Sequence, residues 1–363
     1  MSDEDTVKRF RDIVSSLYTS IRDGNIPELQ MASRSKDNIV LDKFSAVWKY
    51  GTSTVNRSAG NLDGAQYMLK LLYMLEFIEG MIKTQKSSTL REMYYISEGW
   101  NLAKFGAQDE SNLIAEDLEV LAGLLREDFK LRPEENGASI MGNLTIEEKT
   151  RKGEFKKINC RDDVGDSGYS IPYNVENEKL HILDVDADYV LAIETGGMFD
   201  RLVENGFDED SRALLIHLKG QPARSTRRLM KRLNVEKNIP IYVFTDGDPW
   251  SFRIYGSIAY GAIKTAHISE HLAVPTAEYI GITASDILNY DLPTDKLTER
   301  DVAALVSEQK DPRFASEFWA QEIETMLNIG KKAEQQALAK YGLDYVTKTY
   351  LPEKLSEMGV FRN

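Results

Sequence analysis

Hydrophobic residues near the start of the chain recur at helical spacing. An apolar residue returns every three or four positions at Val7, Phe10, Val14, Leu17 and Ile21. This spacing predicts a helix with one apolar face over residues 3–23, which Gly24 and Pro27 end. The stretch 28–64 that follows is polar and weakly periodic. The helix therefore packs either on its own domain or on a partner protein, and the pattern leaves both open.

Helical spacing returns at residues 65–82, and a capping box opens the next helix. Thr89 is an N-cap residue type and Glu92 stands three positions later. A further helix is expected over residues 111–128, with strand-like runs at 139–146 and 155–160. Helices followed by a hairpin are the order of a winged helix-turn-helix domain.

Beyond a stretch rich in Gly, Pro and Asn at residues 165–179, strands and helices alternate. Near-continuous apolar runs predict buried strands at 189–194, 213–218 and 239–245. Helices are expected at 198–204, 225–233, 250–263, 298–308 and 314–341. Buried strands separated by helices indicate a parallel sheet covered on both faces.

Composition and charge narrow the functional classes. The chain has 363 residues, with 28% charged and 42% hydrophobic residues, which is typical of a folded protein of two or three domains. Its net charge is −13, so a surface that binds phosphate would need basic residues that cluster at one place in an acidic protein. Cys160 is the one cysteine, so disulfides within the chain and cysteine zinc sites are excluded. The acidic N-terminus and the lack of a long apolar run predict a cytoplasmic protein without a membrane span.

Three carboxylates are predicted to meet at one edge of the sheet. Glu194 ends one strand, and Asp246 and Asp248 follow another. The carboxyl ends of parallel strands share an edge, and carboxylates gathered there repel one another unless a cation lies between them. Hard oxygen ligands suit Mg²⁺. An Asp-Gly-Asp sequence also occurs in plain turns, but its position between a buried strand and a helix favours the metal site.

A phenol could supply the nucleophile. Tyr95 lies four residues after Arg91, so both side chains share a helix face. The guanidinium could stabilise a phenolate or hold a phosphate beside it. Tyr94 is expected to face elsewhere and to pack.

The most basic stretch runs from Lys219 to Leu233. Such a stripe is often only a solvated face. Because it leaves the carboxyl end of a strand in an acidic protein, we expect contacts with a phosphate backbone. The candidate side chains are Lys219, Arg224, Arg227, Arg228 and Lys231. The sequence has no G-x-x-x-x-G-K-[ST] motif, so ATP hydrolysis by this chain itself is not expected.

Four motifs in this order resemble the A subunits of archaeal DNA topoisomerase VI, a type IIB family related to the meiotic double-strand-break transesterase. They are Thr89-Leu-Arg-Glu-Met-Tyr-Tyr95, Ala192-Ile-Glu194-Thr-Gly-Gly, Lys219-Gly-Gln-Pro-Ala-Arg224 with Thr226-Arg-Arg228, and Thr245-Asp-Gly-Asp-Pro-Trp250. The resemblance extends from about residue 65 to the C-terminus.

The resemblance implies a multidomain α/β and α+β fold. A winged-helix domain of the CAP type with the catalytic tyrosine would span 65–160, and a Toprim domain with a mainly parallel sheet and C-terminal helices would span 181–363. Residues 1–64 would form an N-terminal helical extension and 161–180 a linker.

The resemblance also implies an isomerase that breaks and rejoins double-stranded DNA, associated with the nucleoid. Tyr95 rather than Tyr94 would attack the backbone and form a 5′-phosphotyrosyl link. Glu194, Asp246 and Asp248 would hold Mg²⁺. Two A subunits would form a homodimer and build an A2B2 heterotetramer with an ATPase B subunit, with the N-terminal helix as the candidate contact. The Asp-x-Asp motif lacks the third acid of the broader Toprim superfamily, which leaves the number of metal ions open.

Two other functions fit the same residues. In a Toprim-type metal-dependent nuclease, water would attack the phosphodiester and Tyr95 would only pack. In a winged-helix DNA-binding or scaffold protein, the acidic cluster would be incidental.

Overall fold

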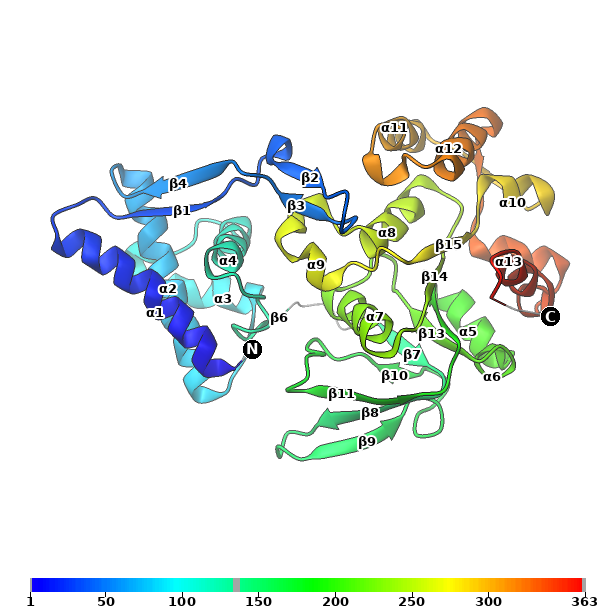
Figure 1. The fold of residues 1–363 in the computed structure, drawn as a ribbon, viewed down its shortest axis with the longest axis horizontal. Helices are drawn as coiled ribbons and strands as arrows, with labels where there is room; N and C mark the ends of the chain where they lie inside the picture. Colours follow the sequence, from blue (N-terminus) through cyan, green and yellow to red (C-terminus); the bar gives the residue numbers. More distant parts are fainter. Residues whose placement is uncertain (1, 133–137, 361–363) are drawn as a thin grey trace. The chain divides into compact units, whose positions relative to one another are not determined.

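A computed structural model describes residues 2–132 and 138–360. The chain divides into two compact units (Figure 1). The first unit contains Met1–Val40, Lys49–Glu135 and Ile263–Ile268. The second contains Leu41–Trp48, Asn136–Ala262 and Ser269–Asn363. The predicted boundaries at residues 64, 160 and 180 differ from this division.

The first unit is mainly helical. Its longer helices are α1 (Asp3–Arg22), α2 (Leu62–Thr84), α3 (Leu90–Ile96) and α4 (Gln108–Ala122). Its strands include β1 (Glu28–Ala32), β4 (Thr54–Ser58), β5 (Ser88–Thr89) and β6 (Leu131–Arg132). The short strands β2 (Ile39–Leu41) and β3 (Trp48–Tyr50) each contain a boundary of this division, after Val40 and after Trp48. β1 pairs with β4 in antiparallel fashion, and β5 pairs with β6 in parallel fashion.

The helix predicted over residues 3–23 is confirmed as α1, which packs on its own unit. Phe10 and Leu17 lie in the core of this unit, and the Phe10 ring meets Phe129 edge to face. Val14 and Ile21 of the predicted apolar face are exposed instead. The remainder of the predicted helical extension, residues 28–64, contains the strands β1 to β4. Leu29 and Met31 alternate with exposed neighbours in β1, a two-residue period that the prediction missed.

The second unit is built on a mainly parallel sheet, which confirms the expected core. Within the described residues the six strands have the order β10-β7-β13-β12-β14-β15. The strands β12 (Tyr189–Ile193), β13 (Ala213–His217), β14 (Ile241–Phe244) and β15 (Glu278–Gly281) are parallel, with β15 at one edge. Strand β7 (Ser139–Met141) pairs in antiparallel fashion with β13 and with β10 (Tyr169–Ser170), which forms the other edge. Alternate residues of β12 belong to two different buried clusters, so both faces of this sheet are covered.

Helices follow most of these strands. The helices are α5 (Gly196–Glu204), α6 (Phe207–Asp210), α7 (Arg224–Lys237), α8 (Pro249–Ala259), α9 (Ser269–Leu272), α10 (Ala284–Asn289), α11 (Glu299–Glu308), α12 (Glu317–Ile329) and α13 (Leu351–Glu357). The helix predicted over 314–341 is wrong in its extent: α12 ends at Ile329 and is capped by Gly330, whose φ of 64° is left-handed. Strand β17 (Lys331–Lys332), which pairs with β16 (Asp295–Lys296), and the 3-10 helix η6 (Gln335–Tyr341) follow.

A second sheet holds the hairpin that the sequence assigned to a wing. Strands β8 (Leu144–Lys149) and β9 (Phe155–Asn159) pair as predicted. However, β11 (Leu180–Val185), which begins at the last residue of the predicted linker, completes a three-stranded sheet with them, within the second unit. The winged-helix interpretation required this hairpin to belong to the helical unit, whereas it belongs to the second unit. Among residues 2–132 and 138–360, no helix combines the length and apolar character that crossing a bilayer requires.

Candidate active site

Tyr95 lies on α3, which begins as the capping box predicts. The Glu92 backbone N–H donates to Thr89 Oγ1 at 3.0 Å, and the Thr89 backbone N–H donates to Glu92 Oε2 at 2.7 Å. The start of this helix is therefore fixed at Thr89. Tyr95 is 58% exposed, whereas Tyr94 is half-buried against the core of the first unit. The centres of the two rings are nevertheless 5.4 Å apart, so Tyr94 packs as expected but does not face away from Tyr95.

A pocket of about 420 Å³ surrounds the two phenols. Its lining residues are Leu90, Arg91, Tyr94, Tyr95, Gln108, Asn112 and Arg132. The Arg91 guanidinium carbon lies 6.0 Å from the centre of the Tyr95 ring, so the predicted pairing on one helix face is present. The pocket combines a phenol and two guanidiniums, which are the groups that transfer of a phosphodiester needs.

Arg132 is a member of this pocket that the sequence did not reveal. It lies on β6, which pairs with β5 just before α3. Its Nη2 lies 3.9 Å from Glu92 Oε2, and its buried Nε has no hydrogen-bond partner among the described residues. Gln108 and Asn112 of α4 also escaped prediction. The weak pairing leaves the Arg132 guanidinium able to bind an anion.

The predicted carboxylates meet at one edge of the main sheet in the second unit. Glu194 directly follows β12, and Asp246 and Asp248 follow β14, its hydrogen-bonded neighbour. The Glu194 backbone N–H donates to Phe244 O at 3.1 Å, so the two strands end level. The prediction that these strand ends share an edge is confirmed.

Hydrogen bonds orient two of these carboxylates. Glu194 Oε2 accepts from the Asp246 backbone N–H at 3.0 Å and from Ser251 Oγ at 2.7 Å. Asp248 caps α8, because its Oδ1 accepts from the Ser251 backbone N–H at 2.8 Å. Ser251 thus contacts both acids, although no sequence signal pointed to it.

The third carboxylate, Asp246, is oriented by a segment far along the chain. Its Oδ1 accepts from the Gln335 backbone N–H at 2.7 Å. Burial is the largest cause that raises the pKa of Asp246 to about 7, and the carboxylates of Glu194 and Asp248 add to it. Burial also raises the pKa of Glu194. Both shifts mark a site where negative charge is concentrated and poorly solvated.

The donor set fits a hard divalent cation. The hydrogen bonds above use one oxygen of each of the three carboxylates, and no further bond to the other oxygens is present among the described residues. Carboxylate oxygens are the ligands that Mg²⁺ prefers. In the described part of the chain, no group of three or more His, Cys, Asp or Glu side chains is arranged so that it could hold a metal ion. The three carboxylates therefore suit the cation by their donor chemistry alone.

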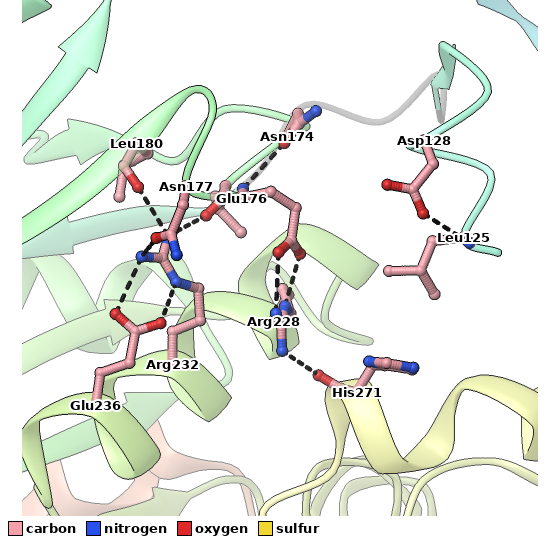
Figure 2. Close-up of polar contacts among 11 residues, drawn as sticks. Leu125, Asp128, Asn174, Glu176, Asn177, Leu180, Arg228, Arg232, Glu236 and His271 are labelled. Carbon is pink, nitrogen blue, oxygen red and sulfur yellow. Dashed lines mark hydrogen bonds and ion pairs between the residues drawn. The ribbon is translucent and has the colours of Figure 1, made fainter. Parts of the chain in front are cut away.

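The basic segment forms α7, and its cations differ in their surroundings. Arg228 is held by Glu176 through two bonds of 2.6 and 2.9 Å, and it also donates to His271 O at 3.2 Å (Figure 2). Arg227 is buried, and Arg224 and Lys231 are half-buried. Lys219, in the loop before α7, is exposed. The predicted inward side chains of α7, Leu229 and Leu233, are buried.

Within the same helix, Arg232 has a structural role. It is buried and donates to Glu236 Oε1 at 2.6 Å and to Leu180 O at 2.8 Å (Figure 2). It also bonds Val175 O and Asn177 Oδ1. Arg232 therefore fixes the loop before β11 to α7.

Comparison with protein families gives three matches along the chain. Residues 66–131 match the family described as type IIB DNA topoisomerase. Residues 134–186 match the all-beta domain in DNA topoisomerase VI alpha subunit. Residues 189–355 match the Toprim domain of the topoisomerase 6 A subunit/Spo11 family. The four parallel strands β12 to β15 of the main sheet, with the acidic edge, lie in this Toprim match.

Curated proteins resemble the chain over nearly its whole length. A protein of Archaeoglobus fulgidus is 57% identical over 348 residues, which are 96% of each chain. One from Natronomonas pharaonis is 54% identical over 360 residues, 99% of this chain and 97% of the relative. One from Methanosarcina mazei is 52% identical over 354 residues, 97% and 95%. All three are named as A subunits of type 2 DNA topoisomerase 6.

Proposed function

The chain belongs to the family of type 2 DNA topoisomerase 6 A subunits, and on that premise we propose that it is the DNA-cleaving and DNA-rejoining subunit of an ATP-dependent type IIB topoisomerase. The observation that carries the proposal is the exposed Tyr95 phenol in a pocket with Arg91 and Arg132. The carboxylates at the Toprim sheet edge supply the second half of the chemistry.

The proposed reaction is a transesterification. The Tyr95 oxygen loses its proton to solvent and attacks the phosphorus of a DNA phosphodiester. The bond to the 3′-oxygen breaks, and this oxygen leaves with the bonding electrons and takes up a proton. The product is a 5′-phosphotyrosyl link, whose bond energy allows the 3′-hydroxyl to reverse the step. Arg91 and Arg132 would neutralise the charge on the phosphate oxygens.

We assign the metal to the three carboxylates. Glu194, Asp246 and Asp248 would hold a divalent cation, with Mg²⁺ as the cofactor. Each would use the carboxylate oxygen that accepts none of the hydrogen bonds described above. When bound, this ion would stabilise charge on the phosphate and on the leaving oxygen. Glu194, whose pKa burial raises, would exchange the proton with the 3′-oxygen.

We propose that the working particle is an A2B2 heterotetramer. Each tyrosine would act together with the carboxylates of the other protomer of an A homodimer, so that both DNA strands break. The ATPase B subunit would gate strand passage, since this sequence has no P-loop. The helices α2 to α4 of the first unit would bind the DNA duplex as a winged-helix domain does. Val14, Tyr18 and Ile21 give α1 an exposed apolar surface, which supports it as the B-subunit contact.

The deciding experiment traps the covalent intermediate. The complex of the chain with its B subunit is incubated with supercoiled plasmid, Mg²⁺ and ATP, then denatured, and DNA-linked protein is collected. We expect Tyr95→Phe to abolish the adduct, because the nucleophilic oxygen is lost. Tyr94→Phe, the matched control on the half-buried neighbour, is expected to keep the adduct.

The same assay separates the two other functions. A metal-dependent nuclease would release protein-free linear DNA, and Tyr95→Phe would leave that cleavage unchanged. A DNA-binding or scaffold protein would give neither adduct nor cleavage, and Asp246→Ala would change nothing. An adduct that survives Tyr95→Phe would refute the proposed nucleophile.

A further inference from the structure

Gln335 lies beneath the acidic sheet edge and is completely buried, with 0% exposure. Its Oε1 accepts from Thr195 Oγ1 at 2.9 Å and from the Thr195 backbone N–H at 3.3 Å. Its Nε2 donates to Phe244 O at 3.1 Å. One amide side chain therefore joins the residue after Glu194 to the last residue of β14, the strand that leads to Asp246.

The backbone of the same residue contacts an acid directly. The Gln335 N–H donates to Asp246 Oδ1 at 2.7 Å. Two residues earlier, Ala333 and Gly247 exchange backbone bonds of 2.8 and 3.2 Å, which tie the segment to the turn between Asp246 and Asp248. The segment 333–335 thus runs across the two strand ends that carry the carboxylates.

We propose that Gln335 is a positioning residue for the metal-binding carboxylates. This inference rests on the metal site assigned under the proposed function. Its side chain holds the segment 333–335 in place, and its backbone N–H then directs one oxygen of Asp246 away from the cation. The other oxygen of Asp246 is left for the metal.

The physical reason lies in the repulsion within the site. Glu194 and Asp248 place two further carboxylates at the same sheet edge as Asp246, so an Asp246 carboxylate without a fixed donor would turn away from them. A buried amide whose oxygen and nitrogen both have partners holds one orientation, whereas an apolar side chain of equal length would leave the Thr195 backbone N–H without its acceptor and would remove one of the two donors to Phe244 O. Groups that orient metal ligands commonly change metal affinity by about 10-fold to 100-fold when removed.

The test measures metal binding by the full chain without DNA. Mn²⁺, which takes the same oxygen ligands as Mg²⁺, is titrated into wild type, Gln335→Met and Gln321→Met. Methionine keeps the length of glutamine but removes both hydrogen-bonding atoms. We expect Gln335→Met to raise the Mn²⁺ dissociation constant about tenfold. Gln321→Met, on the exposed face of α12, should leave it unchanged.

A second readout uses the complex with the B subunit. The Mg²⁺ concentration for half-maximal adduct formation should rise with Gln335→Met, whereas the dissociation constant for DNA without metal should not change. A merely structural role would lower thermal stability without this selective shift. If Gln335→Met fails to fold, Thr195→Val replaces it. That variant keeps the backbone bond to Gln335 but removes the two bonds of the Thr195 hydroxyl, to Gln335 Oε1 and from Gln336 Nε2, so we expect a shift in the same direction of about two- to threefold.

Asp246→Ala separates failure of this inference from failure of the proposed function. If Asp246→Ala abolishes Mn²⁺ binding while Gln335→Met binds like wild type, Gln335 has no positioning role and the metal site stands. If Asp246→Ala itself binds Mn²⁺ like wild type, the metal assignment is wrong and the inference falls with it.

Discussion

Arg132 brings a second guanidinium into the pocket of Tyr95. Two cations beside one phenol exceed what stabilisation of the phenolate alone requires, since Arg91 already lies over the ring. The second cation has a natural partner in a phosphodiester, whose two unbridged oxygens accept charge-assisted hydrogen bonds. Glu92, at 3.9 Å, holds the Arg132 guanidinium only loosely before DNA arrives.

We therefore expect Arg132→Ala to slow formation of the covalent adduct by about 10- to 100-fold, which corresponds to the about 1.5–3 kcal/mol of one charge-assisted hydrogen bond. The measurement is the single-turnover rate of adduct formation at saturating DNA. Arg300→Ala, which removes an exposed guanidinium from α11, is the matched control. A rate for Arg132→Ala equal to that of Arg300→Ala would exclude Arg132 from the site.

The residues that sequence reasoning found are those whose signal is local. Tyr95 and Arg91 share a helix face, and Glu194 and Asp246 each follow a buried strand, so spacing alone indicated their positions. Arg132 and Gln335 carried no such signal. Gln335 reaches Thr195 across 140 positions of the chain, and only the folded sheet brings the two together. A glutamine between Glu334 and Gln336 also gives no hint from composition that it is buried.

At the scale of elements, strong hydrophobic patterns were predicted well and short elements were not. The apolar runs of β12, β13 and β14 stood out because both faces of the sheet are covered. By contrast, β15 begins at the exposed Glu278, and β1 to β4 are partly exposed, so their apolar runs are interrupted. The helical spacing on both sides of Gly330 hid the end of α12, where the left-handed glycine stops it.

The N-terminus of α11 supplies an acid whose pKa couples folding to pH. Asp301 is buried and accepts from the Thr298 backbone N–H, Lys332 Nζ and Trp250 Nε1, each at 2.9 Å. Burial alone would raise the pKa of Asp301, but these hydrogen bonds outweigh it and lower that pKa to about 2. The charged form is thus favoured in the folded state.

Because the pKa of Asp301 is lower in the folded state than in the unfolded state, its ionised form stabilises the fold. This stabilisation is present above the pKa of the unfolded state, near 4, and is lost as the pH falls toward 2. We expect Asp301→Asn to lower the free energy of unfolding at pH 7 by about 2 kcal/mol. Between pH 7 and pH 3, wild type should lose about 1 kcal/mol more than this variant. Urea unfolding at both pH values measures the difference. Asp295→Asn, an exposed control, should follow wild type, and a pH dependence shared by all three proteins would contradict the coupling.

At the scale of the whole molecule, the net charge of −13 repels the negatively charged phosphates of DNA. Binding therefore depends on where the cations are free to meet phosphate. The sequence placed five candidates around α7, but it could not show which of them the fold already uses. Arg228 is engaged by Glu176 in a two-bond ion pair, whereas Lys219 is exposed and Lys231 half-buried.

The salt dependence of DNA binding distinguishes these cations, because each phosphate contact releases about one counterion. We expect Lys219→Ala and Lys231→Ala each to reduce the slope of log affinity against log salt by about one. Arg228→Ala should leave the slope unchanged and lower the free energy of unfolding by about 2 kcal/mol, since Glu176 loses its partner. Lys310→Ala, an exposed control on another surface, should change neither quantity. If Arg228→Ala alone reduced the slope, the ion pair with Glu176 would have to open on DNA, and Arg228 would be the phosphate contact of α7.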